Sequence, residues 1–271
     1  MTDAITTEQA ELPDGLRLPY AEHGDPAGAP LLLLHGYTDS WRSFAPLLPH
    51  LPASIRAVAP SMRGHGDAGR PDSGYRAADL AADIAGLMDA LGLDYAVVLG
   101  HSMGSQVARR LAADHPGRVR GLVLVGAFAS LHGNPVVREL WDGAVSTLED
   151  PVDPGFVRAF QESTVARPVP PALLDTAVAE SLKVPARIWR AALQAQMEPG
   201  DAPARIEAPA LLLWGDQDAI ATRADQDALL AAMPRARLVV HAGAGHAPHW
   251  EEPARVAADV AAFVAGLAAR A

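Results

Sequence analysis

Residues 100–104, GHSMG, constrain most strongly what this chain can fold into. They stand between an apolar run, AVVL at 96–99, which is typical of a buried strand, and an alanine-rich stretch that predicts a helix. Glycines two positions before and after the serine permit a strained strand-to-helix turn, because the missing side chains let the two elements approach closely. The pattern alone is a weak signal. In this context it predicts that Ser102 presents a nucleophilic hydroxyl at the end of a sheet, rather than lying in an ordinary glycine-rich turn.

The rest of the chain alternates between apolar runs and helical patterns. A short strand pair is expected near residue 15 onward, and continuous apolar runs, typical of strands covered on both faces, lie at 30–34, 55–59, 95–99, 122–125, 210–214 and 237–240. Helical patterns lie at about 77–91, 105–115, 224–233 and 253–270. This alternation predicts an α/β fold, in which a mostly parallel twisted sheet carries helices on both faces.

The interval between Val125 and Ala210 breaks this alternation, because it is far longer than a crossover needs and contains no good strand. It holds short amphipathic segments, each introduced by a proline, at about 135–148, 154–164, 171–182 and 185–197. A proline favours the start of a helix and stops the preceding one. We therefore predict a core domain formed by 1–127 and 206–271, with a helical cap, 128–205, inserted over the sheet, where α/β proteins build pockets.

A serine hydroxyl is a weak nucleophile that needs a base within hydrogen-bond reach and a carboxylate to orient that base. His246 is the best candidate base, because it follows the last predicted strand in a glycine-containing loop before the final helix. Asp218 is the best candidate acid, just past the preceding strand. Asp216 competes with it, but the residue closer to a strand tends to cap the turn. The rival base His249 is expected to pack near the loop or adjoin the pocket rim.

Acyl chemistry also needs two N–H donors aimed at the developing negative oxygen. The N–H of Met103 follows the nucleophile at the start of a helix, where the helix dipole favours negative charge. The second donor should come from the turn after the strand at 30–34, where His35-Gly36-Tyr37 stands, and we assign it to the Tyr37 N–H.

Together these segments resemble an α/β-hydrolase-fold serine hydrolase of the small, cap-bearing group that includes esterases, enol-lactonases, C–C hydrolases and cofactor-free haloperoxidases. The resemblance extends from about residue 15 to 270 and rests on the segments LLHG at 33–36, RGHG at 63–66, GHSMG at 100–104, WGDQD at 214–218 and GH at 245–246 with EEP at 251–253. Members with a nucleophilic aspartate, the epoxide hydrolases and haloalkane dehalogenases, are disfavoured because Ser102 holds that position. Two residues depart from the pattern: Ser61 replaces a frequent aspartate and Ser105 a frequent glycine.

Large apolar side chains of the predicted cap are candidates for lining the substrate pocket. The alternative is that they form the core of the cap itself. The candidates are Phe128, Leu131, Trp141, Phe160 and Trp189. The histidines His35, His65 and His101 are interpreted as structural partners of loops, with His101 pointing away from the active face.

Composition excludes several classes of protein. The 271 residues carry a formal net charge of −10 and show no cluster of basic residues, so nucleic acid and anionic membrane surfaces are poor partners. There is no cysteine, and no third ligand is suitably spaced to join His246 and His249, so neither a metal nor a cofactor is expected. The absence of a signal-like start or a long apolar segment predicts a cytoplasmic protein.

The expected activity is hydrolysis of carboxylic esters or lactones of small to medium, rather apolar substrates through an acyl-enzyme intermediate. An alternative enzyme with the same residues cleaves a C–C bond in a vinylogous diketone, or makes peracids as haloperoxidase-like enzymes do. A third interpretation is a ligand receptor that keeps these residues but turns over slowly.

Overall fold

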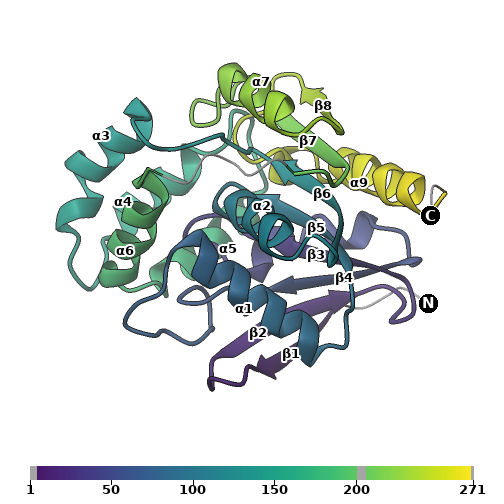
Figure 1. Ribbon diagram of the computed structural model, residues 1–271. Coiled ribbons are helices and arrows are strands. Elements are labelled where there is room, and N and C mark those ends of the chain that lie inside the picture. Colours follow the sequence, from purple (N-terminus) through teal and green to yellow (C-terminus); the bar gives the residue numbers. More distant parts are fainter. Residues whose placement is uncertain (1–4, 200–205, 270–271) are drawn as a thin grey trace.

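A computed structural model describes residues 5–199 and 206–269. Within them, one sheet has the strand order β1-β2-β4-β3-β5-β6-β7-β8, with β1 and β2 antiparallel to their neighbours and the remaining pairs parallel (Figure 1). The strands are β1 (Thr6–Glu11), β2 (Arg17–His23), β3 (Ala29–Leu34), β4 (Ile55–Pro60), β5 (Ala96–His101), β6 (Val119–Val125), β7 (Ala210–Gly215) and β8 (Ala236–His241). The predicted mostly parallel α/β architecture is confirmed.

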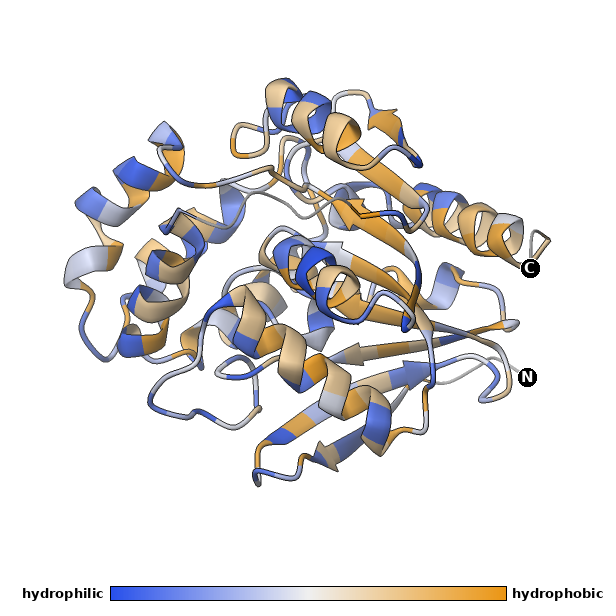
Figure 2. Cartoon of the chain, viewed as in Figure 1, coloured by the Kyte–Doolittle hydropathy of each residue, from blue (hydrophilic) through white to orange (hydrophobic). Residues whose placement is uncertain are grey.

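Helices cover both faces of the sheet, which explains why its central strands are continuous apolar runs. One face packs against α1 (Ala77–Ala90), α2 (Met103–Asp114) and α7 (Arg223–Ala232), and the other against α9 (Pro253–Ala268). All six residues of β5 and of β7 are buried, whereas the edge strands β1 and β8 are largely exposed or half-buried. Figure 2 shows the corresponding band of apolar residues through the middle of the sheet.

Helix boundaries differ slightly from those expected. Helix α2 begins at Met103, two residues earlier than predicted, because the turn at Ser102 leads directly into it. A short helix α8 (Pro248–Glu251) precedes α9, and α9 ends at Ala268, so the predicted end at 270 lies outside the described residues.

In the described part of the interval between β6 and β7 lie four α-helices, as the proline spacing predicts, and one short 3₁₀ helix (Val145–Thr147). The α-helices are α3 (Pro135–Gly143), α4 (Pro154–Glu162), α5 (Pro171–Leu182) and α6 (Ala186–Met197), and we call them the β6–β7 helices. They gather beyond one end of the sheet, at the left of Figure 1. The division into a core domain and a cap remains a prediction, and its outer limits at 1, 205 and 271 fall on residues outside the described part.

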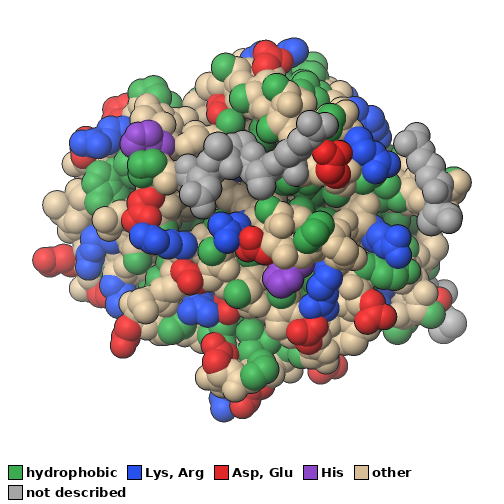
Figure 3. Space-filling model, viewed as in Figure 1, with side chains coloured by type: hydrophobic (Ala, Val, Ile, Leu, Met, Phe, Trp, Pro, Cys, Tyr) green, Lys and Arg blue, Asp and Glu red, His purple; other side chains and the backbone are tan. Residues whose placement is uncertain are grey.

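The described helices include none long and apolar enough to cross a membrane. On the face shown in Figure 3, acidic and basic side chains are interspersed rather than gathered by sign.

Candidate active site

The turn between β5 and α2 holds Ser102 in a strained backbone conformation. Its φ of 51° and ψ of −115° lie in a region that non-glycine residues rarely adopt. Only glycine fits at positions 100 and 104, because neighbouring backbone lies too close for a side chain. A Cβ on Gly100 would lie 2.2 Å from the Gly104 carbonyl oxygen, and a Cβ on Gly104 would lie 2.1 Å from the Leu34 carbonyl oxygen. The sequence pattern therefore reflects a tight packing of β5, α2 and β3 that turns the hydroxyl outward.

Ser102, His246 and Asp218 form a continuous hydrogen-bonded chain. His246 Nε2 lies 2.8 Å from Ser102 Oγ, and His246 Nδ1 lies 2.8 Å from Asp218 Oδ2. The imidazole and the carboxylate are buried, with exposed fractions of 4% and 7%, and Ser102 is half-buried. A carboxylate oxygen accepts, so Nδ1 carries the hydrogen and Nε2 is free to accept the serine proton.

The Asp218 carboxylate is fixed from its other side as well. Its Oδ1 accepts backbone N–H groups from Ile220 at 2.8 Å and Ala221 at 2.9 Å. These bonds hold the side chain so that Oδ2 faces His246, which is the orienting role that a buried acid can serve beside a base.

Asp216, the competing acid, lies differently. Its carboxylate is exposed and accepts the Gly243 N–H at 2.6 Å and a Gln217 side-chain N–H at 3.1 Å. The Gly243 hydrogen bond is the main cause that lowers the pKa of this carboxyl. Asp216 thus ties the end of β7 to the loop after β8 and does not contact His246.

The two N–H groups assigned to the oxyanion hole lie in the loops expected for them. Met103 is the first residue of α2, directly after Ser102, and Tyr37 follows β3, the strand beside β5. Among the hydrogen bonds of the described residues, none uses the backbone N–H of either. Both donors are therefore unpaired within this part of the chain.

His101 packs between two other histidines, His246 and His249. The ring centroid of His101 lies 5.2 Å from that of His246 and 4.4 Å from that of His249. His101 Nε2 donates to the His246 carbonyl at 3.1 Å. Burial, followed by the nearby His249, lowers the pKa of His101 well below its usual value, and burial lowers that of His249 to about 3. The prediction that His101 points away from the active face is wrong, because β5 extends to this residue and directs its ring under the His246 loop.

Asp39 is a buried acid of the site that sequence reasoning missed. It follows β3 by five residues and is 4% exposed. Its Oδ1 accepts Gln161 Nε2 and its Oδ2 accepts Ser43 Oγ, both at 3.2 Å. Burial is the main cause that raises its pKa to about 7. The sequence indicates this residue only by an aspartate two positions after His35-Gly36-Tyr37. Because aspartates are also common on exposed loops, that position does not predict a buried acid.

A cavity of about 50 Å³ opens beside Ser102 and His246. By this measure one water molecule needs roughly 10–15 Å³, so the space suits a few non-hydrogen atoms. Most of its wall is apolar. The lining residues that are not already in the hydrogen-bonded chain are Tyr37, Asp39, His101, Leu131, Val137, Leu140, Phe160, Gln161, Thr164, Leu193, Gln196, Ile220 and Trp250.

Of the five predicted pocket residues, Leu131 and Phe160 line this cavity. Phe128 and Trp189 are fully buried in the main hydrophobic core instead, and Trp189 packs behind Phe160 with ring centroids 5.4 Å apart. Trp141 is half-buried against the same core and does not line the cavity. These three residues thus hold the surrounding elements together rather than reaching the space beside Ser102.

The described residues include no group of three or more His, Asp or Glu side chains placed to hold a metal ion. His35 and His65 bond to backbone groups, as a structural role requires: His35 Nε2 accepts the Met62 N–H at 2.9 Å, and His65 Nδ1 donates to the Arg63 carbonyl at 2.8 Å. Burial lowers the pKa of His35 to about 3 and that of His65 to about 4, so both are neutral.

Comparison with known proteins identifies the family to which the chain belongs. Residues 29–253 match the family model described as the alpha/beta hydrolase fold, and the chain belongs to this family. It is similar to Lipase 3 of a Moraxella species, at 26% identity over 97% of this chain and 86% of the lipase. An esterase structure from a Rhodococcus species has a TM-score of 0.80 and 28% identity, covering 98% of this chain and all of the esterase.

A soluble epoxide hydrolase of a Corynebacterium species is 34% identical over 131 residues. That match covers 48% of this chain and 45% of the epoxide hydrolase, so the chain spans about half the length of this relative.

Proposed function

We propose that the protein is a serine hydrolase that cleaves carboxylic esters or lactones through an acyl-enzyme intermediate. The observation that carries the proposal is the position of His246, whose ring bridges the Ser102 hydroxyl and the Asp218 carboxylate with both distances at 2.8 Å. A nucleophile, a base in hydrogen-bond contact with it and a fixed orienting group are what nucleophilic acyl transfer requires. The serine also distinguishes this site from those hydrolases of the fold that attack with an aspartate.

In the first half of the reaction, Ser102 Oγ attacks the substrate carbonyl carbon while His246 Nε2 takes the hydroxyl proton. Asp218 holds the Nδ1–H tautomer and stabilises the imidazolium that forms. The oxygen that becomes negative accepts from the Tyr37 and Met103 N–H groups, each worth roughly 3 kcal/mol to such a transition state. His246 then gives its proton to the departing alkoxide, which leaves the acyl group on Ser102.

In the second half, His246 removes a proton from a water molecule, which attacks the acyl carbon. The tetrahedral intermediate collapses, and the proton returns to Ser102 as the carboxylic acid departs. In a lactone, the alcohol and the acid belong to one molecule, so a single ring-opened product leaves. No step needs a metal or a cofactor.

The cavity supports a small and rather apolar acyl group. Its volume of about 50 Å³ admits only a few non-hydrogen atoms, and side chains such as Leu140, Phe160 and Leu193 offer nothing that would pair with a charged substrate. We therefore expect short-chain esters to be preferred over long-chain ones.

The test is the turnover of p-nitrophenyl esters with acyl chains of increasing length by the wild type, Ser102→Ala and Ser105→Ala. Ser105 is the matched control, because it lies in the first turn of α2 and its buried hydroxyl has no hydrogen-bond partner among the described residues. We expect Ser102→Ala to lose nearly all activity and Ser105→Ala to keep it. Efficient cleavage of a vinylogous 1,5-diketone, with little turnover of any ester or lactone, would replace the proposal by the C–C hydrolase alternative. Covalent reaction of Ser102 with a fluorophosphonate, without turnover of any of these substrates, would favour a ligand receptor.

A further inference from the structure

Three consecutive residues after β3 each contact a different one of the β6–β7 helices. The hydroxyl of Tyr37 donates to the Trp189 carbonyl in α6 at 2.6 Å. The carbonyl of Thr38 accepts from Ser181 Oγ in α5 at 3.2 Å. Gln161 in α4 donates to Asp39, as described above. We call residues 37–39 the donor segment, because it carries the Tyr37 N–H of the proposed oxyanion hole.

The donor segment is strained at its centre. Thr38 has a φ of 63°, a left-handed conformation that is costly for a β-branched residue. Its side chain is fully buried. A strained backbone of this kind persists only where surrounding contacts fix it. Because Thr38 directly follows Tyr37, whatever fixes Thr38 also restricts the peptide group that bears the proposed donor.

Ser181 supplies much of that restraint. Its hydroxyl oxygen lies 3.2 Å from the Thr38 carbonyl, 3.1 Å from Thr38 Oγ1 and 2.8 Å from Gln161 Nε2. The carbonyl can only accept and the amide can only donate, so the serine donates once, to Thr38 O, and accepts from the other two. This fully buried hydroxyl thus uses its complete hydrogen-bonding capacity to join α4 and α5 to the donor segment.

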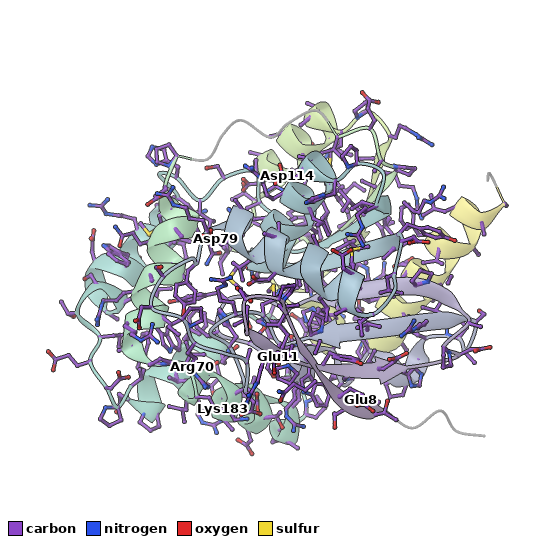
Figure 4. The ribbon with its side chains drawn as sticks, turned by 60° about the horizontal axis from the view of Figure 1, so that its bottom comes forward. Glu8, Glu11, Arg70, Asp79, Asp114 and Lys183 are labelled. Carbon is purple, nitrogen blue, oxygen red and sulfur yellow. The ribbon has the colours of Figure 1, made fainter. Side chains whose placement is uncertain are left out.

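Ion pairs on both sides hold the end of α5 in place. Lys183 Nζ lies 2.9 Å from Asp67, and Glu180 lies 3.3 Å from Arg42. Arg70 donates to the Lys183 carbonyl at 3.2 Å, and Figure 4 shows these two residues lying side by side. Ser181 lies between Glu180 and Lys183, so its hydroxyl has little freedom to move away from Thr38.

We propose that Ser181 and Gln161 are positioning residues, through which the helices covering the cavity fix the Tyr37 N–H in the direction of the developing oxyanion. The inference rests on the proposed function. It follows that these helices not only limit the space for the substrate but also hold one donor of the proposed oxyanion hole in position. An interaction that acts where charge develops raises kcat and leaves substrate binding nearly unchanged.

The experiment compares Ser181→Ala with Thr176→Ala. Thr176 is the matched control, because it is a hydroxyl residue of the same helix whose side chain donates to the Ala172 carbonyl of its own helix. For Ser181→Ala we expect kcat on a short-chain p-nitrophenyl ester to fall about 10- to 100-fold, with KM changed less than about threefold. The inhibition constant of an alkyl boronic acid, which forms a tetrahedral adduct on serine, should rise by a factor similar to the loss in kcat.

Ser181→Cys, which retains a weak donor at similar volume, should fall between the wild type and Ser181→Ala in both kcat and boronate affinity. Unchanged kcat and boronate affinity in Ser181→Ala would overturn the inference. So would a rise in KM at constant kcat, since that result would assign Ser181 to substrate binding. If the wild type itself neither hydrolyses esters nor binds the boronic acid, the proposed function fails, and the positioning role falls with it.

Discussion

The loops at the strand ends and the β6–β7 helices build different halves of the site. The loops contribute Ser102, Asp218 and His246, joined by hydrogen bonds that involve no residue of those helices. The helices contribute Val137, Leu140, Phe160 and Leu193 to the apolar wall of the cavity, together with the contacts of Gln161 and Ser181 to the donor segment. For the proposed function, the sheet positions the reacting groups, whereas the helices set the size of the substrate and the orientation of the Tyr37 N–H.

The largest effect should come from the loops. In His246→Ala, Ser102 loses the base that lies 2.8 Å from its hydroxyl, so we expect kcat to fall on the order of 10⁴-fold or more. Circular dichroism and the unfolding midpoint would show whether the fold survives. A loss of less than tenfold in a folded variant would contradict the role of the loops as the chemical half of the site.

Next in size is the difference between the two acids after β7. Asp218→Asn keeps the shape of the side chain but disturbs the tautomer of His246, and we expect kcat to fall by about 10³- to 10⁴-fold. Asp216→Asn should change kcat less than about fivefold, because the hydrogen bonds of this side chain are to Gly243 and Gln217 and not to His246. The reverse order in measured kcat would exchange their assignments.

A smaller effect concerns the stability that Asp39 provides where the loop after β3 contacts α4. Burial raises the pKa of Asp39 from 3.8 to about 7. Between these pH values, the folded protein therefore keeps a proton on Asp39 that the unfolded chain has lost. The stability that neutral Asp39 provides is complete below about pH 4 and is lost as the pH rises through about 7. Besides its partners Ser43 and Gln161, the groups that face it are His101 and His246.

Asp39→Asn removes this titration, because the amide stays neutral and keeps a similar shape. The wild type should therefore lose about 2 kcal/mol or more of its free energy of unfolding, relative to the variant, between pH 5 and pH 8. Urea unfolding at both pH values measures the difference. Parallel changes in the two proteins would show that Asp39 does not titrate in this range.

The smallest effect should distinguish residues within the helices. Phe160 lines the cavity and Trp141 does not, so Phe160→Ala should enlarge the space and shift the preference in kcat/KM towards longer acyl chains by about tenfold. Trp141→Ala should leave that preference within about twofold. An equal shift in both variants would mean that the substrate contacts more of the helices than the cavity indicates.

Much of the sheet and the loop half of the site could be predicted from the sequence. The fold follows from continuous apolar runs, and parallel strands bring their carboxyl ends to one edge, so residues just past β5, β7 and β8 must meet. The catalytic roles of Ser102, Asp218 and His246 remain predictions, but their convergence is visible in the structure.

The helical half was less predictable for a physical reason. An aromatic residue on an amphipathic helix can face either the core or a cavity, and only the packing of the helices decides. Trp189 turned into the core, whereas Phe160 reached the cavity. Asp39 and Ser181 belong to no sequence motif. Their proposed roles rest on their burial and on contacts with residues far away in the sequence: Ser181 and Thr38, for example, are 143 positions apart.

The most direct test of the account is to locate a covalent adduct after reaction with a fluorophosphonate, by mass spectrometry of the digested protein. We predict a single adduct on Ser102 in the wild type, formed far more slowly in His246→Ala and absent from Ser102→Ala. An adduct on another residue, or ester hydrolysis that persists undiminished in Ser102→Ala, would contradict the claim that this serine carries the chemistry.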